Sequence, residues 1–145
     1  MTEPGRVRGN LSFEQRDGRA GIPSGEGTAR ERVGYVFLST DVVDIPAYSG
    51  KPVVTLIGMD LDGIISGIRI LRHSEPILLV GIPEAELTRF VRQYVGRFVG
   101  DRIEIGRGHP EQGRIGVDAI SGATVTVIAE NQVILRSGYQ IARQV

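Results

Sequence analysis

Aromatic and β-branched residues are concentrated in three short runs of the chain, at 34–40, 53–59 and 64–71. Runs of this length and composition are typical of β-strands. The second and third runs are separated by Asp60-Leu61-Asp62-Gly63, a turn sequence whose glycine suits a positive φ. The pattern therefore predicts a strand at 34–40 and, after a proline-containing loop, a hairpin over 53–71.

Residues 84–99 have the spacing of an amphipathic helix. They follow Pro83, which suits a first-turn position, and they end before Gly100. Large apolar residues recur every three or four positions from Leu87 to Phe98. Because the aromatic residues of this segment belong to the apolar stripe, we interpret them as core residues rather than as ligand contacts.

The C-terminal segment fits two patterns. By strand propensity, residues 124–135 would form a second hairpin. Apolar residues across the segment nevertheless recur with helical spacing, and we expect a helix over 123–144. Ser121 can cap the start of this helix. The pattern also allows a break in the helix near Asn131.

These elements together predict an α+β fold. We expect a twisted, mostly antiparallel sheet with the two main helices packed on one side of it. The glycine-rich stretch 101–117 is expected to be an irregular excursion that ends in a short strand. Residues 1–32 combine many glycines and charges with few large apolar residues, so we expect a flexible lead-in to a single domain over 33–145.

Composition narrows the chemistry that this domain can perform. The chain has 145 residues, 41% of them hydrophobic, and it lacks cysteine, which excludes disulfides, thiolate metal ligands and a cysteine nucleophile. Its 2 histidines cannot build a three-histidine zinc centre. The 17 basic residues balance the 17 acidic ones, which argues against nucleic acid as a partner. Because no stretch approaches the ~18 apolar residues of a membrane span and no signal peptide is evident, the chain is expected to be soluble by itself.

The most informative stretch is the segment 118–126, Asp-Ala-Ile-Ser-Gly-Ala-Thr-Val-Thr. It gathers small and hydroxyl-bearing residues where an irregular segment meets the start of a helix. Free N–H groups and the positive end of the helix dipole favour a phosphate there, and Gly122 and Ala123 allow close approach to the backbone. A purely structural role for these hydroxyl groups is the alternative, because serine and threonine cap helices and the Thr126 hydroxyl can hydrogen-bond to a carbonyl one turn back.

The hexapeptide Ser121-Gly122-Ala123-Thr124-Val125-Thr126 resembles the Ser-Gly-Ala-Thr-x-Thr signature of the covalent FMN-binding domain family, which occurs in sodium-pumping and Rnf-type membrane oxidoreductases. Further motifs follow in the order that this family uses: Gly-Tyr-Val-Phe at 34–37, Tyr-Ser-Gly-Lys-Pro at 48–52, Gly-Met-Asp-Leu-Asp-Gly at 58–63 and His-Ser-Glu-Pro at 73–76. The uninterrupted segments 41–46 and 75–83 are most similar to the branch found in a membrane protein required for nitrous oxide respiration. The resemblance covers residues 34–143.

In this family the 5′-phosphate of FMN is esterified to the last threonine of the signature, so the resemblance assigns covalent attachment to Thr126. A threonine hydroxyl is a weak nucleophile, and no residue near it in sequence is an obvious base. The resemblance implies that a magnesium-dependent flavin transferase, ApbE, moves FMN from FAD and reads Asp118 together with residues 121–126. The phosphodiester would then be held by the amides of Gly122, Ala123 and Thr124.

The resemblance also points to a second segment near the cofactor. His73 and Glu75 occupy the place of the family's His-x-Glu-Thr-Pro-Gly loop, although the sequence at 74–77, Ser-Glu-Pro-Ile, departs from it. A surface histidine at a strand end is the alternative for His73. Tyr35, Tyr48 and Leu78 are expected either beside the flavin ring or in the core.

The resemblance implies an electron-transfer domain and not an enzyme with a substrate of its own. Its expected partners are ApbE and the electron donors and acceptors of a respiratory membrane complex, on the periplasmic side of the inner membrane in the parent protein. No metal site and no catalytic residue are expected. The alternative is a non-flavinylated regulatory or protein-interaction module of the same fold, which would bind a partner through the segment 41–52 and the helix at 84–99.

Overall fold

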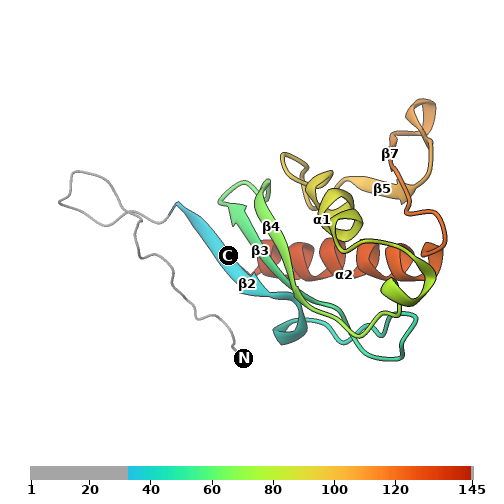
Figure 1. The fold of residues 1–145 in the computed structure, drawn as a ribbon. Helices are drawn as coiled ribbons and strands as arrows, with labels where there is room; N and C mark the ends of the chain where they lie inside the picture. The colour runs from blue at the N-terminus through green and yellow to red at the C-terminus, as the bar shows by residue number, and fades with distance from the viewer. Residues whose placement is uncertain (1–32, 145) are drawn as a thin grey trace.

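A computed structural model describes residues 33–144, which form two three-stranded sheets and two α-helices (Figure 1). The expected lead-in, residues 1–32, lies outside the described residues. The larger sheet has the order β2-β3-β4, and both pairs of neighbours are antiparallel. Its strands are β2 (Gly34–Leu38), β3 (Val54–Asp60) and β4 (Ile65–Arg72). The predicted first strand and hairpin are therefore confirmed.

The turn between β3 and β4 follows from its sequence. Asp60 Oδ1 accepts the N–H groups of Asp62 and Ile64, at 2.9 and 3.0 Å, and Gly63 has a φ of 84°. The aspartate satisfies the backbone of the turn, and glycine adopts this φ without steric cost. An acidic turn of this kind is held by its own side chain and needs no bound ion.

The glycine-rich stretch is more regular than expected. It forms a second sheet of order β5-β7-β6, in which β5 runs parallel to β7 and β6 runs antiparallel to it. The strands are β5 (Arg102–Ile105), β6 (Gly108–His109) and β7 (Arg114–Val117). Glycine allows the backbones in this sheet to approach closely, because a Cβ on Gly116 would lie 2.2 Å from the carbonyl oxygen of Gly106. The sequence pattern predicts only β7 of these three strands.

Helix α1 (Ala85–Arg92) is shorter than the predicted helix over 84–99. The chain leaves the helix because its next residues pair with the start of β4. The Gly96 N–H donates to the Ile65 carbonyl at 2.7 Å, and the Ile65 N–H donates to the Arg97 carbonyl at 2.9 Å. Backbone pairing with the sheet thus ends a segment whose side-chain spacing alone would continue the helix.

The early end of α1 changes which of its expected core residues are buried. Phe90 and Tyr94 are fully buried and pack edge to face, with ring centroids 5.6 Å apart. Val95 and Phe98, beyond the helix, are 46% and 42% exposed. The assignment of the aromatic stripe to the core is therefore right for Phe90 and Tyr94 and wrong for Phe98.

Helix α2 (Thr124–Arg143) confirms the predicted C-terminal helix and excludes the hairpin alternative. It continues without a break through Asn131. The side chain of Asn131 instead links the helix to its surroundings: Nδ2 donates to the Ile103 carbonyl at 3.0 Å, and Oδ1 accepts from the Tyr94 hydroxyl at 2.6 Å.

The expected cap of α2 by Ser121 is wrong. Ala123 occupies the N-cap position, and no side chain caps the helix within the described part of the chain. A turn closed by the Ala123 N–H and the Ile120 carbonyl, 3.0 Å apart, precedes the helix. Gly122 stands in this turn with a φ of 87°. The turn separates Ser121 from the first turn of the helix, so its hydroxyl does not cap it.

Both helices cover the same face of the larger sheet (Figure 1). Burial alternates along β3, where Thr55, Ile57 and Met59 are buried and the intervening residues are partly exposed. The buried face packs with both helices into one core, whose members include Ile57, Met59, Ile65, Leu87, Phe90, Val127 and Ile134. The predicted α+β fold, with two helices on one side of a mostly antiparallel sheet, is confirmed.

Candidate functional site

Thr126 points from the first turn of α2 toward the protein interior and is 4% exposed. Its hydroxyl donates to Glu75 Oε1 at 2.6 Å and does not take the carbonyl one turn back. The two residues are 51 positions apart in the chain. The fold therefore joins the last threonine of the signature to Glu75, a carboxylate that the resemblance had placed beside the cofactor.

The carboxylate of Glu75 is fixed by three hydrogen-bond donors. Besides Thr126, the backbone N–H of Tyr48 donates to Oε1 at 3.0 Å and that of Ser49 donates to Oε2 at 3.2 Å. Burial alone would raise the pKa of Glu75, but hydrogen bonds from Ser49, Thr126 and Tyr48 outweigh it and hold the pKa below its usual 4.5. Glu75 is thus an ionised acceptor at neutral pH.

His73 contacts the backbone of this carboxylate residue rather than its side chain. Its Nδ1 accepts the Glu75 N–H at 3.0 Å, so Nε2 carries the proton and donates to Glu84 Oε1 at 2.8 Å. The His73 side chain is 11% exposed. His73, just after β4, therefore positions the backbone of Glu75. It does not contact Thr126, and it is not a free surface histidine.

Glu130 lies one helical turn after Thr126 and is 1% exposed. Its Oε2 accepts the Thr55 hydroxyl at 2.6 Å, whereas Oε1 has no hydrogen-bond partner within the described structure. Burial, together with the charge of Glu75, raises the pKa of Glu130 to about 8, against the opposing effect of the Thr55 hydrogen bond. No motif points to this residue in the sequence, where the available signal is a glutamate four positions after Thr126 in an apolar helix stripe.

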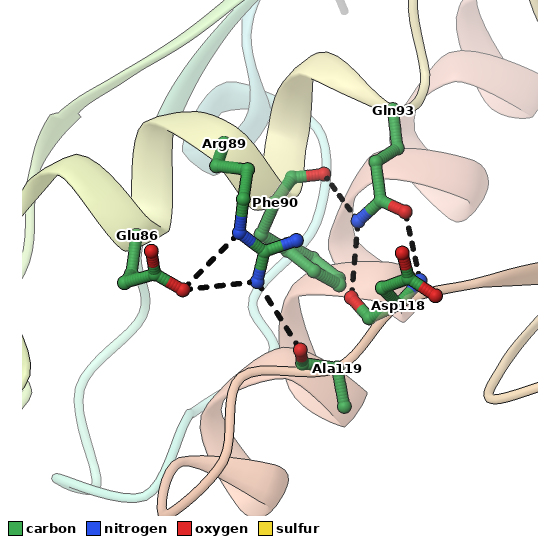
Figure 2. Close-up of polar contacts among 6 residues, drawn as sticks. All are labelled: Glu86, Arg89, Phe90, Gln93, Asp118 and Ala119. Carbon is green, nitrogen blue, oxygen red and sulfur yellow. Dashed lines mark hydrogen bonds and ion pairs between the residues drawn. The ribbon is translucent and has the colours of Figure 1, made fainter.

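The loop before the signature is held by α1 and by Gln93, the residue that follows it (Figure 2). The Gln93 side chain donates to the Asp118 carbonyl at 3.0 Å and accepts the Asp118 N–H at 2.7 Å. Arg89, which also pairs with Glu86 at 3.1 Å, donates to the Ala119 carbonyl at 3.2 Å. The contacts use the backbone of the loop and leave the Asp118 side chain exposed.

The uncapped start of α2 fits a phosphate group. The N–H groups of Thr124, Val125 and Thr126 have no acceptor among the described residues. Unpaired N–H groups and the positive end of the helix dipole favour an anion at such a place. The N–H of Ala123, one of those expected to hold the phosphate, instead donates to the Ile120 carbonyl.

The residues around this helix start differ in accessibility. Ser121, Gly122 and Thr124 are exposed, while Ala123 is buried. A Cβ added to Gly122 would have Ile82 Cδ1 as its neighbour at 3.5 Å, which is an ordinary contact distance. A ligand can therefore reach the backbone of the signature from solvent, although Thr126 itself points inward.

The three expected ring neighbours lie in different surroundings. Tyr48 and Leu78 are each 65% exposed, which excludes the core alternative for both. Tyr35 is partly buried and packs against the core. Tyr48 is nevertheless tied to the site through its backbone, because its N–H donates to Glu75.

Comparison with known proteins identifies the family. Residues 48–136 match the family model of the FMN-binding domain. The chain is 41% identical over 130 residues to the regulatory protein NosR of Pseudomonas aeruginosa and 42% identical over 112 residues to that of Stutzerimonas stutzeri. It is 35% identical over 121 residues to protein NirI of Paracoccus denitrificans. The chain belongs to the FMN-binding domain family, and its relatives include regulatory proteins of the NosR type.

These alignments cover most of the chain but a small part of each relative. They include 86%, 77% and 82% of this chain and 18%, 15% and 17% of the respective relatives. The chain thus spans less than a fifth of the length of the curated relatives it matches. Membership in the family supports FMN as the cofactor. In the region 33–144, neither helix is long and apolar enough to cross a membrane.

Proposed function

We propose that this domain carries FMN as an ester between the 5′-phosphate and the hydroxyl of Thr126, attached by the flavin transferase ApbE from FAD in the presence of Mg²⁺. The observation that supports this most directly is the place of Thr126. It is the last hydroxyl of the family signature, it lies in the uncapped first turn of α2, and it is already hydrogen-bonded to a carboxylate.

The described residues fit the phosphate end of the flavin. The unpaired amides of Thr124 and Val125 would hold the phosphodiester anion, with the exposed Ser121 and Gly122 beside it. Asp118 presents its exposed side chain next to this segment, where a transferase can contact it while Gln93 holds its backbone. A covalent ester would prevent loss of the cofactor during turnover of the respiratory chain.

Attachment requires a local movement, because Thr126 is 4% exposed. The loop of Tyr48 and Ser49 is bound to the same carboxylate through two backbone N–H groups, at 3.0 and 3.2 Å. Water can replace both donors when the loop moves away. We therefore expect the transferase to displace this loop before the hydroxyl reacts.

Bound FMN would supply reversible one- and two-electron redox chemistry, while the protein holds and orients it. We infer an electron-transfer role without a substrate of its own, between donors and acceptors of a respiratory membrane complex. The family resemblance supports a place on the periplasmic side of the inner membrane in the parent protein.

The test is the intact mass of the protein after co-expression with the transferase. The wild-type chain should gain the mass of one esterified FMN and become yellow, whereas Thr126→Val should gain none. Thr88→Val, which removes an exposed hydroxyl from α1, is the matched control and should be modified like the wild type. An unmodified wild-type chain, or FMN on the Thr126→Val variant, would refute the proposal.

A non-flavinylated interaction module is the second candidate, and one observation favours it. The short 3-10 helix at Leu78–Val80 exposes three consecutive apolar side chains, at 65%, 87% and 64%. A protein partner that covers this turn would bind Thr126→Val and wild type equally and would lose affinity for Leu79→Ser. Flavin attachment with no partner binding that depends on Leu79 would exclude this second function.

A further inference from the structure

The outward face of α2 carries a row of apolar side chains that reach solvent. Val125, Ile128 and Tyr139 are 55%, 45% and 48% exposed. Leu135 and Ala142 continue the row and are partly buried, because one side of each packs against the core. Single exposed apolar residues are ordinary on a protein surface, whereas a contiguous row of them marks a contact surface. We call this row the α2 stripe.

The spacing of the α2 stripe is that of a seam between two helices. Its positions alternate in steps of three and four, and five of the six residues are apolar: Val125, Ile128, Gln132, Leu135, Tyr139 and Ala142. This alternation keeps the side chains on one side of a helix, where they can interlock with the side chains of a second helix. At about 1.5 Å per residue the stripe is about 26 Å long, which matches a partner helix of about 18 residues.

The charges that α2 exposes are all positive. Arg136 and Arg143 lie exposed along one edge of the stripe, and the Arg143 guanidinium stands over the Tyr139 ring at 5.7 Å from its centroid. The single acidic residue of α2, Glu130, is buried in the interior. In the region 33–144, neither arginine forms an ion pair. Acidic side chains beside the apolar row of a partner helix would complement both.

We propose that the α2 stripe is the docking surface for an amphipathic helix of a partner protein, with acidic residues beside its apolar row. The apolar row supplies the contact area, and the two arginines select the sign of the partner's charge. Gln132, in the middle of the row, fixes the register, because it requires a hydrogen-bonding side chain opposite it. The inference does not depend on flavin attachment, since the stripe faces outward and Thr126 points inward.

Two other occupants fit this face less well. In a symmetric pair of two copies centred on α2, the two Arg136 side chains would come together with no exposed acid on either helix to compensate. A lipid surface would accept the arginines. It would, however, place Gln132, which lies within the apolar row, in an apolar layer without a hydrogen-bond partner.

The experiment measures the binding of two synthetic helical peptides to the whole chain by isothermal titration calorimetry. Both have leucine at positions spaced by three and four and a glutamine to face Gln132. One has glutamate beside the leucine row and the other has lysine at the same places. We expect the acidic peptide to bind at least about tenfold more tightly at low salt, and the difference to shrink as salt screens the arginines.

Variants of exposed residues locate the binding surface. Ile128→Ser and Tyr139→Ser should each weaken binding of the acidic peptide about tenfold, because both side chains belong to the stripe. Leu61→Ser is the matched control, since Leu61 is 51% exposed in the turn after β3, and it should bind like the wild type. The double variant Arg136→Glu/Arg143→Glu should reverse the preference and bind the basic peptide more tightly. Thermal unfolding checks that each variant is folded.

The results can overturn the proposal in several ways. It fails if the acidic peptide does not bind, if both peptides bind equally well, or if Ile128→Ser binds as tightly as the wild type. Wild-type dimers in sedimentation velocity that Ile128→Ser dissociates would assign the face to a second copy. Cosedimentation with phosphatidylserine vesicles that Tyr139→Ser abolishes would assign it to a membrane. Thr126→Val should bind the acidic peptide like the wild type, so this test is independent of flavin attachment.

Discussion

Gln93 and the backbone of Asp118 form a reciprocal pair of hydrogen bonds, at 3.0 Å from Nε2 to the Asp118 carbonyl and 2.7 Å from the Asp118 N–H to Oε1 (Figure 2). A primary amide meets both backbone groups of one residue in this arrangement. The pair fixes the exit of β7 against the end of α1, and the signature begins three residues later, at Ser121. The side chain of the residue that ends the first helix therefore sets the path of the loop that leads into the second.

We expect Gln93→Ala to lower the free energy of unfolding by about 0.5–1.5 kcal/mol, because it removes two hydrogen bonds to the backbone of Asp118, whose exposed groups water can then bind. Flavin attachment should slow as well, since the loop before Thr126 loses its anchor. Gln132→Ala, an exposed glutamine of α2, is the control and should stay within about 0.5 kcal/mol of the wild type. Urea denaturation measures the first effect and mass spectrometry the second. Equal stability of the two variants would contradict the anchoring role.

The buried carboxyl of Glu130 should make stability decrease as pH rises. Its folded pKa, about 8, lies above the ordinary 4.5, so the folded state binds the extra proton over this interval. The loss should begin above pH 4.5 and level off above pH 8, with a total of roughly 3–5 kcal/mol. Glu130→Gln keeps an acceptor for Thr55 and cannot ionise, so it should be more stable than the wild type at pH 9 and similar at pH 5. Urea denaturation at pH 5, 7 and 9 checks this, and parallel pH profiles would refute it.

Glu75 should produce the opposite dependence at acidic pH. Because its folded pKa is lowered, its contribution to stability is present above the unfolded value of 4.5 and is lost as pH falls through the folded pKa. Thr126→Val removes one of the hydrogen bonds that lower this pKa, so the acid loss should move to higher pH. Thr88→Val should leave the profile unchanged. NMR titration of the Glu75 side chain reports the same shift directly, and an unaltered Glu75 titration in Thr126→Val would contradict the hydrogen bond.

Gly116→Ala should destabilise the second sheet. An added Cβ would lie 2.2 Å from the Gly106 carbonyl oxygen and 2.5 Å from the Gly108 nitrogen, and both are backbone atoms that cannot rotate away. We expect a loss of about 1–3 kcal/mol in the free energy of unfolding, the usual scale of overpacking. Gly67→Ala in β4 is the matched control, since no heavy atom lies within 4 Å of its added Cβ. Equal unfolding midpoints for the two variants would argue against the close pairing of β6 and β7.

The elements that sequence patterns predicted correctly are those defined by local composition. The hairpin over 53–71 has two strand-forming runs around a glycine turn, and α2 has an apolar stripe that extends over its whole length. The end of α1 was missed because the backbone of Gly96 and Arg97 pairs with Ile65, a contact between segments far apart in the chain. The strands β5 and β6 were missed because their pairing depends on close backbone approach at glycines and not on side-chain pattern.

The candidate site divides in the same way. Thr126 and Glu75 could be named from motifs, but no local pattern shows that a hydrogen bond joins them. Glu130 carried no motif, and its role depends on Thr55 of β3, which is 75 residues away. The choice of Ser121 as cap failed because a turn at Ile120 and Ala123 intervenes. Chemistry that arises from residues brought together by folding was therefore outside the reach of sequence analysis.

The three donors of the Glu75 carboxylate come from both sides of it in the chain, 27 and 26 residues earlier for Tyr48 and Ser49 and 51 residues later for Thr126. This arrangement cannot exist until the C-terminal helix has docked on the sheet. A chain whose C-terminal helix has not docked would contain the signature but not the hydrogen bond between Thr126 and Glu75. The titration of Glu75 would thus report on the completion of folding, because only a docked C-terminal helix supplies the Thr126 hydrogen bond to its carboxylate.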